Sequence, residues 1–163
     1  MSSLTPEQVL TLIPQQRPMR FVDTLLEIDE EHILGGYTWN AEDCRGHRAD
    51  GKLVPPFKLI EMAAQIGSVA WCTWLMSQEL PLEEIRHLVG FFTEIREGKF
   101  LNPVHAGDRI LCQATFDDDG YFRRNKILTR VEMQFEGGPK DGETVFLGMI
   151  SGMWLPKAAG NLG

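Results

Sequence analysis

Two side chains capable of proton transfer stand 14 residues apart near the middle of the sequence. His47 follows a glycine in a polar stretch, and Glu61 lies in a predominantly apolar one. Histidine has an ordinary pKa of about 6.5, so the imidazole of His47 can act as a base at neutral pH. A carboxyl group in apolar surroundings favours its neutral form, so Glu61 can act as the matching acid. We therefore interpret the two residues as one catalytic pair.

Each member of the pair also has a structural explanation. A loop histidine is by itself usually a solvated side chain, and a buried glutamate can serve as a structural hydrogen-bond acceptor. A metal site on Asp43, Cys44 and His47 is a third alternative, but no second cluster supplies the remaining ligands. The spacing of the pair favours the catalytic interpretation. Solvated or capping roles are expected for the other three histidines, His32, His87 and His105.

The apolar stretch around Glu61 predicts the main helix. It starts with Pro55 and Pro56, which suit a helix N-terminus, and runs for about five turns over residues 56–78. Gln65 lies one turn after Glu61 on the same face, where its amide can orient the carboxyl group. Small residues fill the middle of the helix and predict close packing against a neighbouring element. They are Ala63, Ala64, Gly67, Ser68 and Ala70.

Most of the remaining sequence is typical of β-strands. A short helix is predicted over residues 5–13, followed by a hairpin with strands over 21–28 and 32–39. Further strands are predicted over residues 88–95, 109–116, 126–135 and 144–155. Without a repeat or linker, residues 1–163 read as one domain. A hairpin, one long helix and a run of strands predict an α+β fold, with an antiparallel sheet wrapped around the helix.

Three separated motifs resemble those of the beta-hydroxyacyl-(acyl-carrier-protein) dehydratases, which have the hotdog fold. The first is the Leu-Pro, Arg-x-Pro and Val-Asp pattern, present here as LIPQQRPMRFVD, and the third is KFLNPVHAGDRIL. The second is a set of residues in the spacing of that family: Asn40, Gly46, His47, Pro55, Glu61 and Gln65. The resemblance covers roughly residues 8–115, and it extends to the divergent dehydratases of aryl polyene pathways.

The resemblance implies dehydration of a (3R)-hydroxyacyl thioester on acyl carrier protein to the trans-2-enoyl thioester, in fatty acid, polyketide or polyene biosynthesis. His47 would remove the C2 proton, and Glu61 would protonate the hydroxyl that leaves C3. In the family these two residues come from different subunits, so a homodimer or a higher oligomer of dimers is expected. Neither a metal nor an organic cofactor is expected. The expected substrate-binding residues are Gln65, Phe57, Lys58, Pro55, Gly90 and Phe91.

The helix start departs from the family pattern. The family has Pro-Gly, whose glycine N–H binds the thioester carbonyl, whereas this chain has Pro55 followed by Pro56. Proline has no N–H, and losing such a donor typically costs about 10²- to 10³-fold in rate. We expect the N–H groups of Phe57 and Lys58 to substitute for it. Two other functions remain open: a hotdog thioesterase that uses Glu61 as nucleophile or base, and a non-catalytic acyl-binding subunit of a dehydratase heterodimer.

Charge restricts the possible partners. The net charge of -7 argues against nucleic acid and against an anionic membrane surface. Because carrier proteins are acidic, docking would use local basic residues, although a basic run after a turn is often only a solvated strand end. The candidates for carrier docking are Arg96, Lys99, Arg123, Arg124 and Lys126.

Cysteine content and hydropathy predict a cytoplasmic protein. The three cysteines form no CxxC pair and are expected to be free thiols, as in a reducing compartment. The first residues do not have the pattern of an export signal. We also expect no apolar stretch near the roughly 18 residues that a membrane-spanning helix needs.

Overall fold

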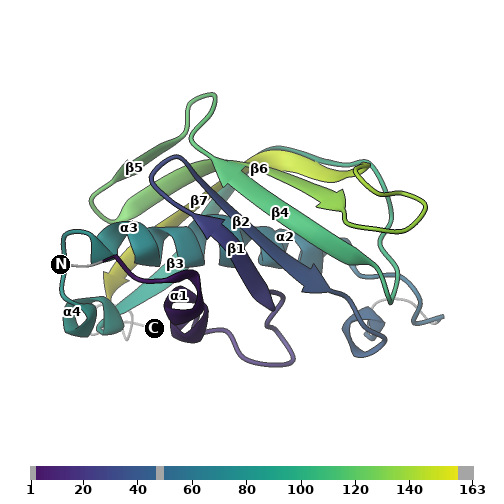
Figure 1. The fold of residues 1–163 in the computed structure, drawn as a ribbon, viewed down its shortest axis with the longest axis horizontal. Helices are drawn as coiled ribbons and strands as arrows, with labels where there is room; N and C mark the ends of the chain where they lie inside the picture. Colours follow the sequence, from purple (N-terminus) through teal and green to yellow (C-terminus); the bar gives the residue numbers. More distant parts are fainter. Residues whose placement is uncertain (1–2, 47–49, 158–163) are drawn as a thin grey trace.

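A seven-stranded antiparallel sheet wraps around one long helix (Figure 1). The computed structural model describes residues 3–46 and 50–157. The strand order is β1-β2-β4-β6-β7-β3, and β5 pairs with β6. The strands are β1 (Thr24–Ile28), β2 (His32–Thr38), β3 (Leu88–Phe100), β4 (Arg109–Thr115), β5 (Tyr121–Arg123), β6 (Lys126–Phe135) and β7 (Thr144–Pro156). The helical segments are α1 (Pro6–Leu12), η1 (Glu42–Cys44), α2 (Pro56–Ala64), η2 (Gln65–Ala70), α3 (Trp71–Ser77) and α4 (Leu82–Arg86). This arrangement confirms the predicted α+β architecture.

The N-terminal helix α1 is fixed at both ends. Thr5 and Gln8 form a reciprocal capping box, and Pro6 occupies the first turn. At the other end, Arg20 donates from Nη2 to the carbonyl of Leu10 at 2.7 Å. Ile13, just after the helix, is buried. The chain that leaves α1 is therefore held against the body of the protein.

The central helix is continuous from Pro56 to Ser77, but its winding changes midway. Residues Gln65–Ala70 form a π-helical segment, η2, between α2 and α3. A Cβ at Gly67 would lie 3.1 Å from Ala114 Cβ and 3.2 Å from Thr129 Oγ1. The small side chains therefore let the sheet approach the helix closely, as predicted.

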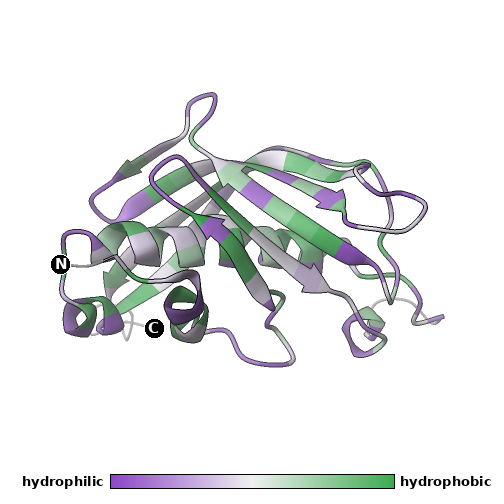
Figure 2. Cartoon of the chain, viewed as in Figure 1, coloured by the Kyte–Doolittle hydropathy of each residue, from purple (hydrophilic) through white to green (hydrophobic). Residues whose placement is uncertain are grey.

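This helix corrects one expectation from the sequence. By length and composition, Pro56–Ser77 is long and apolar enough to cross a membrane. However, 78% of its most apolar window is buried inside the protein, as expected of a core helix. Figure 2 shows hydrophobic residues along this helix and the strands around it, with hydrophilic residues concentrated in the turns.

The outermost strand β3 differs most from prediction. It extends to Phe100 rather than ending at residue 95, and it forms one edge of the sheet with β7 as its neighbour. The short strand β5 and the short helix α4 were not predicted, and β1 begins at Thr24 rather than at residue 21. Three large apolar side chains on this strand are solvent-exposed: Phe91, Phe92 and Ile95 are 39–47% exposed.

Candidate active site

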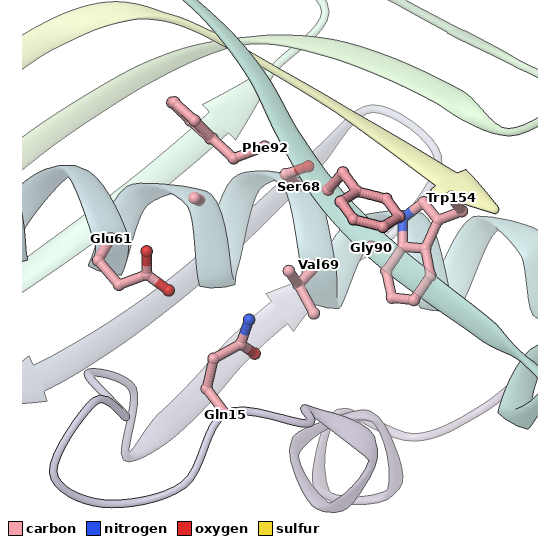
Figure 3. Close-up of a pocket in the computed structure, with 9 residues that line it drawn as sticks. Gln15, Glu61, Ser68, Val69, Gly90, Phe92 and Trp154 are labelled. Carbon is pink, nitrogen blue, oxygen red and sulfur yellow. The ribbon is translucent and has the colours of Figure 1, made fainter. Parts of the chain in front are cut away.

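The side chain of Glu61 lines a small cavity beside the central helix. Glu61, Ala64 and Ser68 lie on one helical face, because their spacing is three and four residues. The cavity has a volume of about 50 Å³. Its lining combines helix, β3, β7 and the segment after α1, through Gln15, Glu61, Ala64, Ser68, Val69, Gly90, Phe91, Phe92 and Trp154 (Figure 3). A space of this size holds about one or two water molecules, so an acyl chain needs a larger enclosure than this face alone provides.

The Glu61 carboxylate is oriented by Gln65. Gln65 Nε2 donates to Glu61 Oε1 at 3.0 Å and to the carbonyl of Met19 at 2.6 Å, and Gln65 Oε1 accepts from the N–H of Phe21 at 2.8 Å. Gln65 is fully buried. The predicted orienting contact is therefore present. Direct contact between Gln65 and a substrate stays a prediction.

The start of the helix does not supply the donor expected from Lys58. The Lys58 N–H donates to the carbonyl of Pro55 at 2.9 Å, which closes the first turn. Its ammonium group is buried as well and donates to the carbonyl of Asp43 at 2.7 Å. Lys58 therefore ties the helix to the preceding loop. Pro55 is buried, and the side chain of Phe57 is 53% exposed; neither lines the Glu61 cavity.

The loop before the helix is built on Asp43. Its carboxylate accepts from the Tyr37 hydroxyl at 2.9 Å and from the Asn40 N–H at 3.0 Å, and Asn40 Oδ1 accepts from the Asp43 N–H at 3.1 Å. Burial, together with this hydrogen bond to Asp43, raises the pKa of Tyr37 to about 12. The Asp43 carboxylate therefore stabilises the fold of this loop. His47, the proposed base, lies outside the described residues, so its position relative to Glu61 stays a prediction.

The three cysteines are free, as predicted, and all three are buried. Burial raises the pKa of the Cys44 thiol. Cys44 Sγ lies 3.5 Å from the carbonyls of Asn40 and Lys52, which holds the two sides of the loop together. Among residues 3–46 and 50–157 no group of histidines, cysteines and carboxylates is arranged to hold a metal ion.

Gly90 and Phe91, two of the predicted substrate-binding residues, do line the cavity with Glu61. A Cβ at Gly90 would lie 3.3 Å from carbon atoms of the Trp154 ring. Glycine at this position therefore lets the indole lie against β3 and close one end of the cavity (Figure 3). Gln15 and Trp154 were not predicted, because only long-range folding brings them to Glu61. Ser68 was not predicted as a cavity residue either, although its helical spacing from Glu61 places it on the same face.

The basic residues proposed for carrier docking fall into two groups. Arg123, Arg124 and Lys126 belong to the β5–β6 hairpin, whose turn residue Asn125 exchanges two hydrogen bonds with the main chain of Trp154, at 2.6 and 2.7 Å. The hairpin is thereby attached to a wall of the Glu61 cavity. The second group lies on β3, where Arg96 pairs with Glu94 at 2.9 Å and Lys99 stands farther along the strand.

Solved structures share this fold. The dehydratase heterocomplex ApeI:P from Xenorhabdus doucetiae aligns with a TM-score of 0.70 at 16% identity, over 95% of this chain and 94% of that one. The thioesterase HI1161 from Haemophilus influenzae aligns with a TM-score of 0.65 at 13% identity, over 95% and 93%. The chain therefore has the hotdog fold, which at these identities is all that the structures establish.

Proteins with similar sequences identify the family to which the chain belongs. No protein-family model matches the chain. The 3-hydroxyacyl-(acyl-carrier-protein) dehydratase FabZ of Bacillus licheniformis is 32% identical over 110 residues, which are 66% of this chain and 71% of that protein. The FabZ of Bacillus thuringiensis is 33% identical over the same shares. The chain belongs to the FabZ family of hotdog-fold dehydratases.

Proposed function

We propose that the protein dehydrates a (3R)-hydroxyacyl thioester carried by acyl carrier protein to the trans-2-enoyl thioester. The observation that carries the proposal is the Glu61 carboxylate, fixed by Gln65 and open to a cavity, in a chain of the FabZ family. His47 takes the C2 proton, and the electron pair of that bond forms the C2=C3 double bond. The C3–O bond breaks as Glu61 protonates the departing hydroxyl, which leaves as water.

The site is proposed to form between two copies of the chain. β3 pairs with β7 on one side only, within the described residues, and a free strand edge recruits another strand. Phe91, Phe92 and Ile95 on this strand are exposed, and the first two border the Glu61 cavity. A second copy on β3 would cover these residues and enlarge the enclosure around Glu61. We propose that it also contributes its own His47.

The catalytic assignment is tested by following enoyl formation from a 3-hydroxyacyl thioester. His47→Ala and Glu61→Gln are each expected to abolish turnover, whereas His87→Ala, which changes an exposed histidine after α4, should not. A mixture of refolded His47→Ala and Glu61→Gln chains should regain activity, because a mixed dimer contains one intact site. Unchanged turnover in His47→Ala would exclude the mechanism.

The dimer itself is tested with charged substitutions on the two sheet edges. Ile95→Lys on β3 is expected to give a monomer in light scattering and to lose turnover. Leu26→Lys on β1, at the opposite edge and 48% exposed, is the matched control and should leave the mass unchanged. An Ile95→Lys protein that stays dimeric would place the interface elsewhere.

Two alternatives make different predictions in the same assay. A thioesterase releases free thiol without an enoyl product, and HI1161 shows only that this fold can belong to a thioesterase. A non-catalytic subunit would be inactive alone and active with a competent partner. Pro56, which lacks an N–H, is the feature that favours this second alternative.

Carrier docking is proposed for the β5–β6 hairpin, through Arg123, Arg124 and Lys126, with Arg96 and Lys99 as the second group. The hairpin is preferred because Arg96 already pairs with Glu94. The three free cysteines support a cytoplasmic location. Charge reversal at Arg123 and Arg124 should raise KM for the carrier-bound substrate but not for a small thioester.

A further inference from the structure

Gln15 projects its carboxamide into the cavity that also receives the Glu61 carboxylate (Figure 3). It lies in the segment between α1 and β1. Its Oε1 atom is buried and accepts no hydrogen bond from the described residues. Native proteins rarely leave a buried carbonyl oxygen without a donor, because desolvation is then uncompensated. The oxygen is therefore suited to a donor that arrives with a ligand.

Two other buried side-chain atoms lack partners in the described part of the chain, Trp39 Nε1 and Ser151 Oγ. Neither residue lines the Glu61 cavity. Gln15 differs from both because its unpartnered atom belongs to a residue that shares a cavity with the acid.

The segment that carries Gln15 is held in place on both sides. Ile13 is 2% exposed and anchors the chain before it. After it, the carbonyl of Met19 and the N–H of Phe21 are both bonded to Gln65, which in turn holds Glu61. The chain segment that follows Gln15 is thus attached to the same side chain that orients Glu61.

We propose that Gln15 positions the hydroxyl group that the reaction eliminates, by accepting its hydrogen bond at Oε1. This role rests on the proposed dehydration. A hydroxyl has one hydrogen to donate and two lone pairs. With its hydrogen directed to Gln15, the oxygen presents a lone pair to the proton on Glu61. When the C3–O bond breaks, that lone pair accepts the Glu61 proton, and the departing water keeps its hydrogen bond to Gln15.

The chemical consequence is discrimination between substrates. Gln15 should favour a 3-hydroxyacyl thioester over a saturated acyl thioester of the same length, since only the former carries the donor. Losing one neutral hydrogen bond of this kind typically reduces affinity by roughly 2- to 10-fold. Affinity for the saturated thioester should not change.

The test uses this whole chain with His47→Ala, which is expected to block turnover and so lets binding be measured. Affinities for 3-hydroxyacyl and saturated acyl pantetheine thioesters are compared with and without Gln15→Met. Gln16→Met, the same change at the next and exposed residue, is the control. We expect Gln15→Met to remove the preference for the hydroxyl and to keep binding of the saturated chain, which also reports an intact fold.

A preference for the hydroxyl that survives Gln15→Met would overturn the proposal, even if the native enzyme forms enoyl product. A preference that depends on Gln15 in a protein without dehydratase activity would support the role of Gln15 and reject the proposed function. In the active enzyme, Gln15→Met should raise KM more for the 3-hydroxyacyl substrate than for the enoyl thioester in the reverse reaction, with a smaller fall in kcat.

Discussion

Gln65 Nε2 donates one hydrogen bond to the carboxylate of Glu61 at 3.0 Å and another to the carbonyl of Met19 at 2.6 Å. Its oxygen accepts from the N–H of Phe21. One buried side chain thus joins the acid to the chain segment that follows Gln15. The orientation of Glu61 and the placement of that segment depend on the same three hydrogen bonds.

Replacing Gln65 with methionine, of similar size, should therefore affect stability and catalysis together. The buried N–H of Phe21 and the partly buried carbonyl of Met19 would lose their partner, which costs about 1 to 3 kcal/mol in the free energy of unfolding. Urea denaturation measures this loss, and kcat should fall because Glu61 is no longer oriented. Gln113→Met, on the exposed side of β4, is the control. Native stability in Gln65→Met would contradict the network.

Lys58→Met should loosen the loop that precedes the helix. The substitution removes the hydrogen bond from the ammonium group to the carbonyl of Asp43 and leaves that carbonyl without this donor. Because the loop leads to His47, a small displacement would lower kcat by roughly 10- to 100-fold. Lys52→Met, at an exposed lysine of the same loop, should leave kcat unchanged. Equal kcat values for the two variants would rule out this positioning role.

Pro56→Gly introduces a main-chain N–H at the helix start. If the thioester carbonyl lies there, the new donor should stabilise the developing enolate oxygen and raise kcat by about tenfold or more. Steady-state kinetics with a 3-hydroxyacyl thioester measures the change. Pro81→Gly, at the start of α4, tests for general effects of replacing a helix-start proline. An unchanged kcat in a folded Pro56→Gly protein would mean that the carbonyl binds elsewhere.

The ion pairs of His32 should make stability depend on pH. The hydrogen bond to Glu27 at 2.7 Å raises the pKa of His32, partial burial opposes the shift, and Asp29 adds to it. Protonated His32 thus stabilises the folded state. Its contribution is complete below the unfolded pKa of about 6.5 and is lost as pH rises through the higher folded pKa.

The prediction is read from the free energy of unfolding of the native protein and of His32→Gln. The native protein should be more stable by up to about 1 kcal/mol in mildly acidic solution, and the difference should vanish in alkaline solution. If the stability difference between the native protein and His32→Gln grew with rising pH, the pKa of His32 would be lowered by folding, not raised.

Gly152→Ala tests the close approach between the helix and β7. A Cβ at Gly152 would overlap the hydroxyl oxygen of Ser68, whereas it would lie 3.4 Å from Ser68 Cβ. Overpacking of this kind typically destabilises by about 1 to 3 kcal/mol. Adding Ser68→Ala should recover most of the loss, with Ser68→Ala alone as the reference. Additive effects in the double variant would contradict the predicted contact.

Local patterns predicted much of this molecule. The strand bounds expected for residues 126–135 are those of β6, because alternation and flanking turns are both clear there. The contact between Glu61 and Gln65 follows from helical spacing alone. The strand β3 was predicted too short because charged residues follow Ile95. An edge strand can carry such residues and still pair with its neighbour.

The rest depends on information that local patterns do not contain. Gln15 and Trp154 are more than a hundred residues apart in sequence, and only the folded chain brings them into one cavity. The Lys58 N–H was expected to bind the substrate carbonyl. In the structure it donates instead to the carbonyl of Pro55 and closes the first turn of the helix. His47 was found through its spacing and its resemblance to a family, and no local pattern fixes where its side chain points.

The π-helical segment η2 separates the part of the helix that carries Glu61 from α3. A π turn contains a surplus residue, which rotates everything on one side of it by roughly 100° relative to an unbroken α-helix. The direction of Glu61 and the direction of the packing residues in α3 are therefore set independently. In geometry, η2 is equivalent to a one-residue insertion absorbed within a single turn. Deleting one residue there should convert η2 to regular α-helix and keep both Glu61 and α3 in their present orientations.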